Sequence, residues 1–419
     1  MLDIKFIREN AGTIKQNCKN RNVDVNINRL LELDEVRREN IGKIDELREE
    51  KNKKSKQKPS DEEVERMKTL GESIKKLEEQ NSKVMEEYSE LLYKIPNLTH
   101  PDAPIGNEDD YVILYNNKEP KEFNFEPHDH ETLLSNLDAL DFERGAKVTG
   151  SKFYFAKNDL VLLNLALINY GIQVLKKHGF IFMQTPDLAK ERIIEASGFN
   201  PRGEESQIYK IENNDLNLIG TAEITMLGYH ADEVLDMKKG PKKYAAMSHC
   251  FRTEAGSYGK ASKGLYRVHQ FEKLEMFVFC KPEESESVHE ELLEIEKEIC
   301  DGLNLPYRVI DVPSADLGGP AYRKYDIECW MTMLAEEGGQ GNYGEITSCS
   351  NCTDYQARRL NIKYKNDQGD TKFVHTLNGT ALVLSRFPIA IVENNQQEDG
   401  SIIIPEILRG WMGKDKIAN

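Results

Sequence analysis

A regular spacing of apolar residues between positions 60 and 93 constrains this chain more than any other feature. The period of three and four residues predicts one side of a helix in a coiled coil over about four heptads, and a single Asn in such a seam can fix its register. The seam consists of Met67, Leu70, Ile74, Leu77, Asn81, Val84, Tyr88 and Leu91. A looser series over about residues 28–57 predicts a second helix, with Leu30, Leu33, Val36, Ile41, Ile44 and Leu47 on one side.

A short polar link joins these two helices and favours an antiparallel hairpin. Pro59 ends the first helix, and Ser60 with Glu63 forms a capping box for the second. Helices of roughly 30 residues give a hairpin about 45 Å long. The tip of the hairpin is basic, with Lys51, Lys53, Lys54, Lys56 and Lys58. These residues leave two interpretations open: a dimerising coiled coil with a solubilising tip, or an arm whose basic end meets nucleic acid.

A proline-containing segment from Ile95 to Gly106 predicts the end of this hairpin. We therefore expect a helical arm, residues 1–105, and a larger body, residues 106–419. The arm is neutral, because residues 1–100 contain 21 basic and 21 acidic residues, and the body carries the net charge of −16. A neutral arm can still contact phosphates through a local basic patch, so the charge of the whole chain excludes no partner.

The composition of the chain is that of a protein with an ordinary core. Hydrophobic residues make up 39% and charged residues 31%. We find no run of about 18 apolar residues and no apolar segment after Met1 of the kind that starts a signal peptide. The seven cysteines are an odd number in a chain large enough to fold without disulfides. These features predict a cytoplasmic protein in a reducing compartment.

The body mixes helices and strands without a regular βαβ rhythm. Residues 159–178 predict an amphipathic helix, residues 180–183 a short apolar strand, and the Glu-rich residues 283–300 a solvated helix. Several segments alternate with period two, which favours an antiparallel sheet. The predicted fold class is α+β, with an N-terminal antiparallel two-helix coiled-coil arm.

Two predicted strands between Lys243 and Cys280 are the most informative part of the body. In the second strand, from Leu265, apolar and polar side chains alternate. Its polar face would hold Arg267, His269, Phe271, Lys273 and Glu275, beside Arg252 and Glu254 of the first strand. Arginines, carboxylates and a phenyl ring on one face suit a nucleotide. They equally suit a ladder of cross-strand salt bridges on a solvated sheet.

Two further segments carry weaker signals. Residues 373–385 alternate, with Asn378, Thr380, Leu382 and Leu384 on one side, and Pro388 opens a helix after Arg386. On its own, Arg386 is best explained as an ordinary exposed arginine. Glu345 and Ser348 could share a cation. Cys349 and Cys352 lack a second ligand pair, so we interpret them as reduced thiols and not as a zinc site.

Taken together in order, these segments resemble the seryl-tRNA synthetases. Residues 251–257 and 264–273 are similar to motif 2 of that family, and residues 378–394 to its motif 3. Thr221-Ala222-Glu223 is similar to its TAE element, and residues 345–351 resemble its E-x-S-S-C-S-N segment. The N-terminal hairpin resembles its tRNA-binding arm. The resemblance covers nearly the whole chain, and the joint occurrence of the motifs in order is highly specific.

This resemblance implies a class II synthetase core, an antiparallel sheet flanked by helices, that forms a homodimer through motif 1 at residues 159–186. It implies an ATP-dependent serine–tRNA ligase with L-serine, ATP, Mg²⁺ and tRNA(Ser) as ligands, and it leaves tRNA(Sec) open as a second substrate. Arg252 would bind the α-phosphate and the serine carboxylate, Glu254 the adenine amino group, and Phe271 and Arg386 the two faces of adenine. With Arg252, Glu254 and Arg386 as catalytic residues, the implied ATP site also includes Thr253, Arg267, Phe271, Glu345, Ile346, Thr347 and Ser348. Serine would be held by Thr221, Ala222, Glu223, Arg252, Glu275, Asn378 and Thr380, the metal by Glu345 and Ser348, and tRNA by the five lysines of the arm.

The chain departs from the family pattern at a few positions. Gly220 stands where proline usually precedes the TAE element, and Gly344 stands where many members have arginine. Two other functions remain to be weighed: a synthetase-like ligase that loads amino acids onto carrier proteins, and a scaffold without catalysis. The relatives of the first kind lack the helical arm, and the retained Arg252, Glu275 and Arg386 argue against the second.

Overall fold

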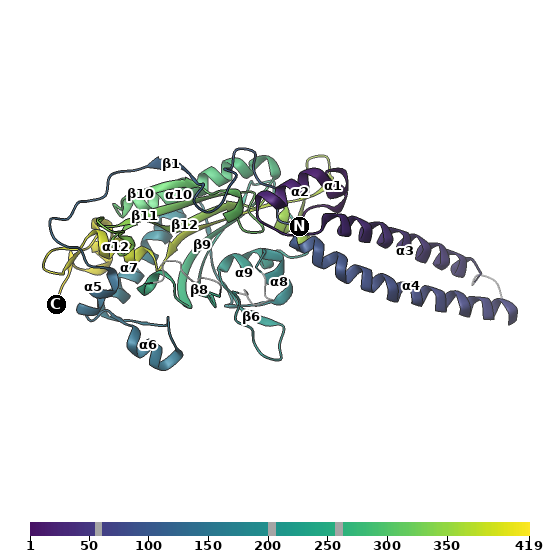
Figure 1. Cartoon of the computed structure of the whole chain (residues 1–419), viewed down its shortest axis with the longest axis horizontal. Helices are drawn as coiled ribbons and strands as arrows, with labels where there is room; N and C mark the ends of the chain where they lie inside the picture. Colours follow the sequence, from purple (N-terminus) through teal and green to yellow (C-terminus); the bar gives the residue numbers. More distant parts are fainter. Residues whose placement is uncertain (55–60, 200–206, 256–262) are drawn as a thin grey trace. The chain divides into compact units, whose positions relative to one another are not determined.

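The computed structural model describes residues 1–54, 61–199, 207–255 and 263–419. Within these residues the chain forms two compact units, Met1–Leu98 and Thr99–Asn419, and each is described by itself (Figure 1). The first unit ends seven residues before the predicted boundary near residue 105. Residues 100–106 contribute hydrogen bonds within the second unit, from His100 N to Tyr322 O at 2.9 Å and from Ser314 N to Pro104 O at 2.8 Å.

The first unit contains the predicted pair of long helices. After two short helices, α1 (Ile4–Glu9) and α2 (Ala11–Asn20), the chain forms α3 (Ile27–Lys54) and α4 (Asp61–Lys94), which pack along each other. None of the seam residues of α4 is exposed, which confirms the heptad pattern. In α3 the pattern was partly wrong, because Val36 and Ile41 are 42% and 38% exposed. The residues of α3 that are not exposed and keep the three-four spacing include those at positions 33, 37, 40 and 44. Val36 and Ile41 are each the chain neighbour of one of these positions.

Three arginines surround a buried carboxylate near the start of α3. Asp34 is fully buried and forms ion pairs with Arg37 at 2.8 Å, with Arg38 at 3.1 Å and with Arg8 of α1 at 3.1 Å. Arg37 also lies over the ring of Tyr88 in α4, 5.2 Å from its centroid. A buried carboxylate is tolerated only where such partners replace its hydration. This cluster therefore ties α1, α3 and α4 together at one end of the hairpin.

An eight-stranded sheet forms the centre of the second unit. Its order is β1-β10-β11-β12-β15-β9-β8-β4, and all neighbours are antiparallel except β4 and β8. In that order the strands span Val112–Asn116, Tyr307–Asp311, Arg323–Met331, Asn342–Asn351, His375–Val383, Gln270–Cys280, Lys242–Phe251 and Ile181–Gln184. The sheet with its flanking helices confirms the predicted α+β class.

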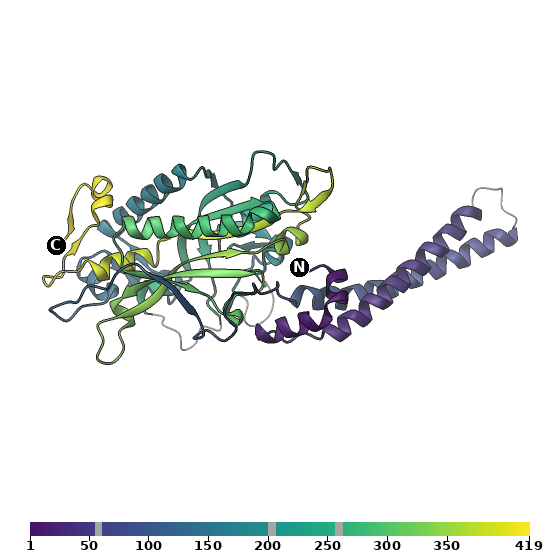
Figure 2. The same ribbon diagram turned by 90° about the horizontal axis from the view of Figure 1, so that it is seen from above.

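Two helices lie side by side across one face of this sheet, α7 (Asn158–Lys177) and α10 (Ser285–Gly302), as Figure 2 shows. The prediction of a helix at 283–300 was right, but the prediction that it is solvated was wrong. One side of α10 packs Leu292, Ile295 and Ile299 into the main core. Helix α7 is long and apolar enough to pass for a membrane span by length and composition. Its Leu160, Leu163 and Leu167 nevertheless belong to the same core, as expected of a core helix.

The remaining elements surround the sheet and its ends. The other helices are α5 (His130–Asn136), α6 (Phe142–Thr149), α8 (Glu191–Ser197), α9 (Ala222–Tyr229), α11 (Tyr355–Arg359), α12 (Phe387–Asn394) and α13 (Arg409–Met412). Small sheets are formed by β2 (Leu140–Asp141) with β3 (Phe155–Ala156), β5 (Leu188–Lys190) with β6 (Leu216–Leu218), β7 (Val234–Leu235) with β13 (Lys363–Lys365) and β14 (Thr371–Phe373), and β16 (Ile402–Ile403) with β17 (Lys416–Ile417). Helix α9 packs on β8 and β9, and its Ala222, Met226 and Leu227 form a second core with Phe277 and Phe279.

Candidate active site

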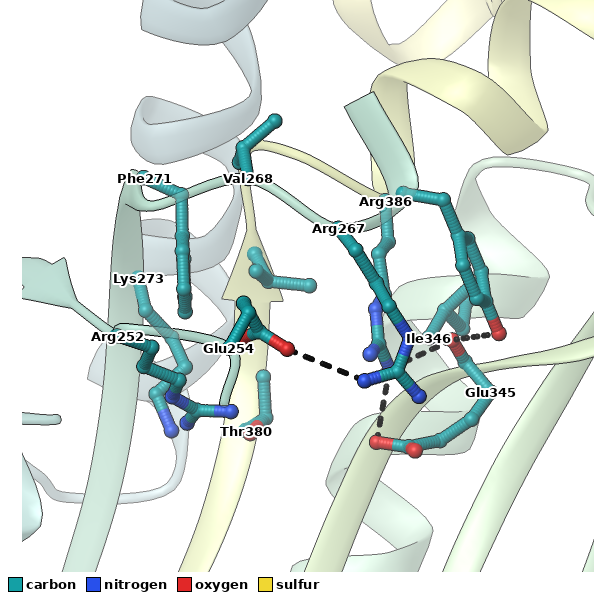
Figure 3. A pocket seen from close by; sticks show the side chains of 12 residues that line it. Arg252, Glu254, Arg267, Val268, Phe271, Lys273, Glu345, Ile346, Thr380 and Arg386 are labelled. Carbon is teal, nitrogen blue, oxygen red and sulfur yellow. Dashed lines mark hydrogen bonds and ion pairs between the residues drawn. The ribbon is translucent and has the colours of Figure 1, made fainter. Parts of the chain in front are cut away.

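A pocket lies among β8, β9, β12 and β15, and it is also lined by the segments after β8, before β9 and after β15 (Figure 3). It encloses about 470 Å³ of space, part of which is open to solvent. Eight of the predicted site residues line it: Arg252, Glu254, Arg267, Phe271, Glu345, Ile346, Thr380 and Arg386. The sequence reasoning gave no role to the other four lining residues, which are Tyr266, Val268, Lys273 and Val383.

The first wall comes from the ends of β8 and β9, which are shorter than predicted. Strand β8 ends at Phe251 and β9 begins at Gln270, so Arg252, Glu254 and Arg267 lie outside the strands and do not share a pleated face. Glu254 has a φ of 52°, in the left-handed region, which turns the chain away from the sheet. Its carboxylate forms an ion pair with Arg267 at 3.1 Å, and Arg252 lies 5.2 Å from the ring centroid of Phe271. These groups converge on a pocket, and they form no ladder along a solvated face.

The opposite wall centres on Arg386. Its guanidinium contacts Glu345 twice at 2.9 Å, through the carboxylate and through the backbone oxygen. It also lies over the ring of Tyr266, 4.7 Å from the centroid. The side chain of Arg386 is only 17% exposed, so the interpretation as an ordinary exposed arginine was wrong. A Cβ at Gly344 would come within 2.5 Å of Leu334 and 3.0 Å of the Tyr266 hydroxyl. A side chain at 344 would therefore require Leu334, and to a smaller extent Tyr266, to shift.

A bulge in β12 explains how Glu345 and Ser348 share a face although they are three residues apart. The register with β11 shifts at this point, with Thr347 opposite Ile327 but Glu345 opposite Glu328. Ile346 is the extra residue, and it brings Glu345 and Ser348 to the same side. The bulge also turns the Thr347 hydroxyl to the other face, where it donates to Glu296 of α10 at 2.8 Å.

Glu345 and Ser348, beside this bulge, supply oxygen atoms of the kind that a hard divalent cation binds. Partial burial by itself would raise the pKa of Glu345. The positive charges of Arg386, Lys324 and Arg252 outweigh this effect, and the pKa of Glu345 is lowered. On the neighbouring strand, burial raises the pKa of Asp326 to about 7 although Lys324 opposes this. Among the described residues no group of three or more His, Cys, Asp or Glu is placed to hold a metal. Mg²⁺ often takes only one or two protein oxygens, with phosphates and water completing its shell.

A second bulge lies in β15. It puts Thr380 and Leu382 on opposite sides of the sheet, although strict alternation would put them on the same side. Thr380 pairs with Glu275 but Leu382 pairs with Leu274, so Ala381 is the extra residue. Asn378 and Thr380 therefore face the pocket side, whereas Leu382 turns into the main core. The prediction that Leu382 shares their side was wrong.

A buried polar cluster adjoins the pocket and contains the residues expected to bind serine. Glu223 in α9 accepts hydrogen bonds from Gln356 at 2.7 Å and from Asn378 at 3.2 Å. Burial and the nearby Glu275 carboxyl raise the pKa of Glu223 to about 7. Burial also raises the pKa of Glu275, although Lys273 forms an ion pair with it. Thr221 caps α9 and bonds to Glu275, and Ala222 is the fully buried first residue of that helix.

Sequence reasoning missed Gln356 and the role of Lys273. Gln356 comes from α11, and it binds Glu223, Thr376 and the backbone oxygen of Ser197. Nothing in its sequence neighbourhood marks it, because its partners are 20 to 159 residues away. Lys273 was visible on the polar face of β9, but its burial beside the Glu275 carboxylate could not be read from the sequence.

The predicted residues are not all in the pocket. Thr253 donates its backbone N–H to Gln207 O at 3.1 Å and does not line it. Of the five lysines, Lys51 and Lys53 are exposed at the end of α3, and Lys53 forms an ion pair with Glu49 at 2.6 Å. Lys54 ends the helix. Its side chain lies outside what the structure describes, and so do Lys56, Lys58, Ser60 and the side chain of Glu63.

Comparisons with known proteins agree with this geometry. Residues 1–99 match the model of the seryl-tRNA synthetase N-terminal domain, and residues 208–395 match the class II core domain of tRNA synthetases for G, H, P, S and T. The chain is 51% identical to a serine–tRNA ligase of Treponema denticola over the full length of both. Among solved structures, it resembles seryl-tRNA synthetase of Pyrococcus horikoshii complexed with ATP, with 37% identity, a TM-score of 0.89, and 100% and 99% of the two chains covered. It also resembles the cytoplasmic serine–tRNA ligase of Naegleria fowleri in complex with AMP, with 34% identity, a TM-score of 0.85, and 100% and 98% covered. The chain therefore belongs to the seryl-tRNA synthetase family of class II aminoacyl-tRNA synthetases, the serine–tRNA ligases.

Proposed function

We propose that this enzyme activates L-serine with ATP to seryl-adenylate and transfers the serine to tRNA(Ser). The observation that carries the proposal is the pairing of two arginines and a phenyl ring around one pocket, beside a buried cluster of hydrogen-bonding groups. The first set suits a nucleotide, and the second suits a small amino acid with a hydroxyl group.

In this proposal the pocket holds ATP between Phe271 and Arg386. Glu254 accepts the adenine amino group, Arg267 keeps Glu254 in place through their 3.1 Å ion pair, and Arg252 reaches the α-phosphate. Of the other residues expected to contact ATP, Ile346 lines the pocket, whereas Thr253 and Thr347 do not. The first step requires no side-chain base, because the serine carboxylate is itself the nucleophile and pyrophosphate leaves. Catalysis then consists of positioning and neutralisation of charge on the phosphates.

Serine binds in the adjoining polar cluster. Its carboxylate meets Arg252, and its amino group meets the acidic side of the cluster, formed by Glu223 and Glu275. Thr221, Ala222, Asn378 and Thr380 complete the subsite around the hydroxyl group. Because these polar groups are buried, a ligand without a hydroxyl leaves them unpaired, which disfavours alanine strongly.

Glu345 and Ser348 are the residues that would hold Mg²⁺. When bound there, the ion would neutralise charge on the phosphates of ATP. The lowered pKa of Glu345 supports this role, since a metal ligand must be ionised.

The helical arm, residues 1–105 by sequence and Met1–Leu98 as a compact unit, would recruit tRNA through its basic tip. The body, residues 106–419, would perform the activation. We also propose a homodimer, because α7 exposes Val161 and Leu165 and the edge strand β4 exposes Ile181 and Phe182. An edge strand with exposed apolar residues is normally covered. A cytoplasmic location and activity on tRNA(Sec) are the remaining parts of the proposal.

Serine-dependent exchange of pyrophosphate into ATP tests the first step, and charging of tRNA(Ser) tests the second. We expect exchange with serine and none above background with alanine, followed by serylation of tRNA(Ser). Exchange that another amino acid supports better than serine would refute the assignment. Transfer of serine to a carrier protein, without charging of tRNA, would favour the alternative ligase. Parallel reactions with tRNA(Sec) decide its place as a substrate.

A further inference from the structure

A fully buried imidazole outside the pocket, His130, has hydrogen-bond partners at both ring nitrogens. His130 is the first residue of α5, and its side chain is 0% exposed. Nδ1 lies 2.7 Å from Oε1 of Glu393, which is also fully buried, and Nε2 lies 2.9 Å from the backbone nitrogen of Leu265. The backbone nitrogen of His130 donates to the same Glu393 oxygen at 2.8 Å.

These partners determine which nitrogen carries the proton. The N–H of Leu265 can only donate, so Nε2 must accept with its lone pair. The proton then belongs on Nδ1, which donates it to the Glu393 carboxylate. The second oxygen of Glu393 accepts from the backbone N–H of Met333 at 3.0 Å. The imidazole is thus a directional link, with its donor toward α12 and its acceptor toward Leu265.

Each end of this link leads directly to an arginine of the pocket. Leu265 lies in the turn Gly264–Tyr266, and the residue after this turn, Arg267, forms the ion pair with Glu254. Glu393 lies in the last turn of α12, the helix that begins immediately after Arg386. The two arginines are 119 positions apart in the chain, so their spacing across the pocket depends on the pairing of β9 with β15 and on contacts such as this one.

Two neighbouring features show that the link is closely fitted. A Cβ at Gly264 would come within 2.1 Å of Nε2, and Gly264 also has a φ of 54°. Only glycine lets the chain approach the imidazole in this conformation. One residue before it, Lys263 forms an ion pair with Asp129 at 2.6 Å. The start of α5 therefore holds the chain at two successive points just before it enters the pocket.

We infer that His130 is a positioning residue that sets the distance between Arg267 and Arg386 across the bound nucleotide. The inference rests on the proposed ATP site. The lone pair of Nε2 accepts from the Leu265 N–H and thereby fixes the backbone position of the following residues, Tyr266 and Arg267. Misplacing a reacting or binding group by about 1 Å can cost about 100-fold in rate, so loss of this acceptor should be visible in kinetics.

Two conservative variants separate the two ends of the link. In His130→Gln the amide oxygen reaches the place of Nε2 and can accept from Leu265. The side-chain bond to Glu393 is lost, but the backbone N–H of residue 130 still donates to Glu393 at 2.8 Å and keeps α5 joined to α12. In His130→Asn the amide reaches only the place of Nδ1, which keeps Glu393 and loses Leu265. His230→Gln is the matched control, because His230 is also buried and bonded at both nitrogens, to Glu233 at 2.7 Å and Tyr244 at 2.9 Å, outside the pocket.

The readouts are kcat and KM for ATP and for serine in pyrophosphate exchange, ATP binding by calorimetry, and the melting temperature. We expect His130→Asn to lower kcat/KM for ATP at least about 10-fold with little change in KM for serine, and His130→Gln and His230→Gln to stay within about 3-fold of the parent. If His130→Asn and His130→Gln lose kcat/KM for ATP equally, and in step with a fall in melting temperature, His130 has only a packing role and the inference is overturned. A larger loss in His130→Gln than in His130→Asn would also overturn it. If the parent enzyme shows no serine-dependent exchange, the proposed function fails, and the ATP affinities of the same variants still decide this inference.

Discussion

Glu223 offers a prediction in which stability and function change in opposite directions. Its pKa is raised from 4.5 to about 7, chiefly by burial and then by Glu275. The folded protein therefore binds the proton more tightly than the unfolded chain, so folding loses stability as the pH rises from about 4.5 to about 7. A difference of roughly 2.5 pKa units corresponds to about 3 kcal/mol, and above pH 7 this cost is fully present.

Replacing the carboxyl by an amide removes this cost. We expect Glu223→Gln to be less stable than or equal to the parent at pH 5, and more stable at pH 8 by up to about 3 kcal/mol. In thermal unfolding, that corresponds to a gain of several degrees for the catalytic unit. The same variant should lose most serine-dependent exchange, because an ionised Glu223 is proposed to meet the serine amino group. In the parent, kcat/KM for serine should fall by up to about tenfold per pH unit below pH 7.

Comparing the parent with Glu223→Gln at pH 5 and pH 8 isolates the contribution of Glu223, because all other titrating groups are present in both proteins. A difference in melting temperature that is the same at pH 5 and pH 8 would refute the reasoning about Glu223. A parent enzyme whose kcat/KM for serine does not change between pH 6 and pH 8 would remove Glu223 from the recognition of the amino group.

Three further predictions concern the other parts of the proposal. Arg252→Ala should lower serine-dependent pyrophosphate exchange at least about 100-fold, the scale of losing one preorganised charge donor, and near-parental exchange in a folded variant would exclude its role. Activity should vanish with EDTA and return with Mg²⁺; restoration by Zn²⁺ alone would point instead to Cys349 and Cys352. A chain that begins at Thr99, where the second unit starts, should keep much of its exchange and lose most tRNA charging, whereas monomers that lose both activities would show that the arm serves dimerisation. Neutralising Lys51, Lys53, Lys54, Lys56 and Lys58 should weaken tRNA binding and flatten its salt dependence.

The sequence predicted those features that follow from local period and from ordered motifs. The seam of α4, the helix α7 and the pairing of β8 with β9 all have a clear spacing of apolar residues, and eight residues taken from motifs 2 and 3 and the E-x-S-S segment line one pocket. A period of two carries no information about where a strand ends. That is why Arg252 and Glu254 were assigned to a strand that ends before them, and Arg267 to a strand that begins after it.

Bulges and distant partners were beyond such reasoning. The extra residues Ile346 and Ala381 reverse the alternation within a strand, and only pairing with the neighbouring strand reveals them. Gln356 and His130 act through residues more than a hundred positions away in the chain, so no local pattern marks them. Residues of this kind become visible only when the contacts of buried polar atoms are followed.

The place of β15 in the sheet has a consequence for how the enzyme is made. It is the last of the eight strands in the chain, yet it lies between β12 and β9. A nascent chain that has emerged only as far as β12 can form two half-sheets, β4-β8-β9 and β12-β11-β10-β1, each with an open apolar edge. Arg252 and Phe271 belong to one half, Glu345 to the other, and Arg386 follows β15. Translation must therefore pass residue 386 before any nucleotide pocket exists, and a prematurely terminated product exposes two edges that invite misassembly.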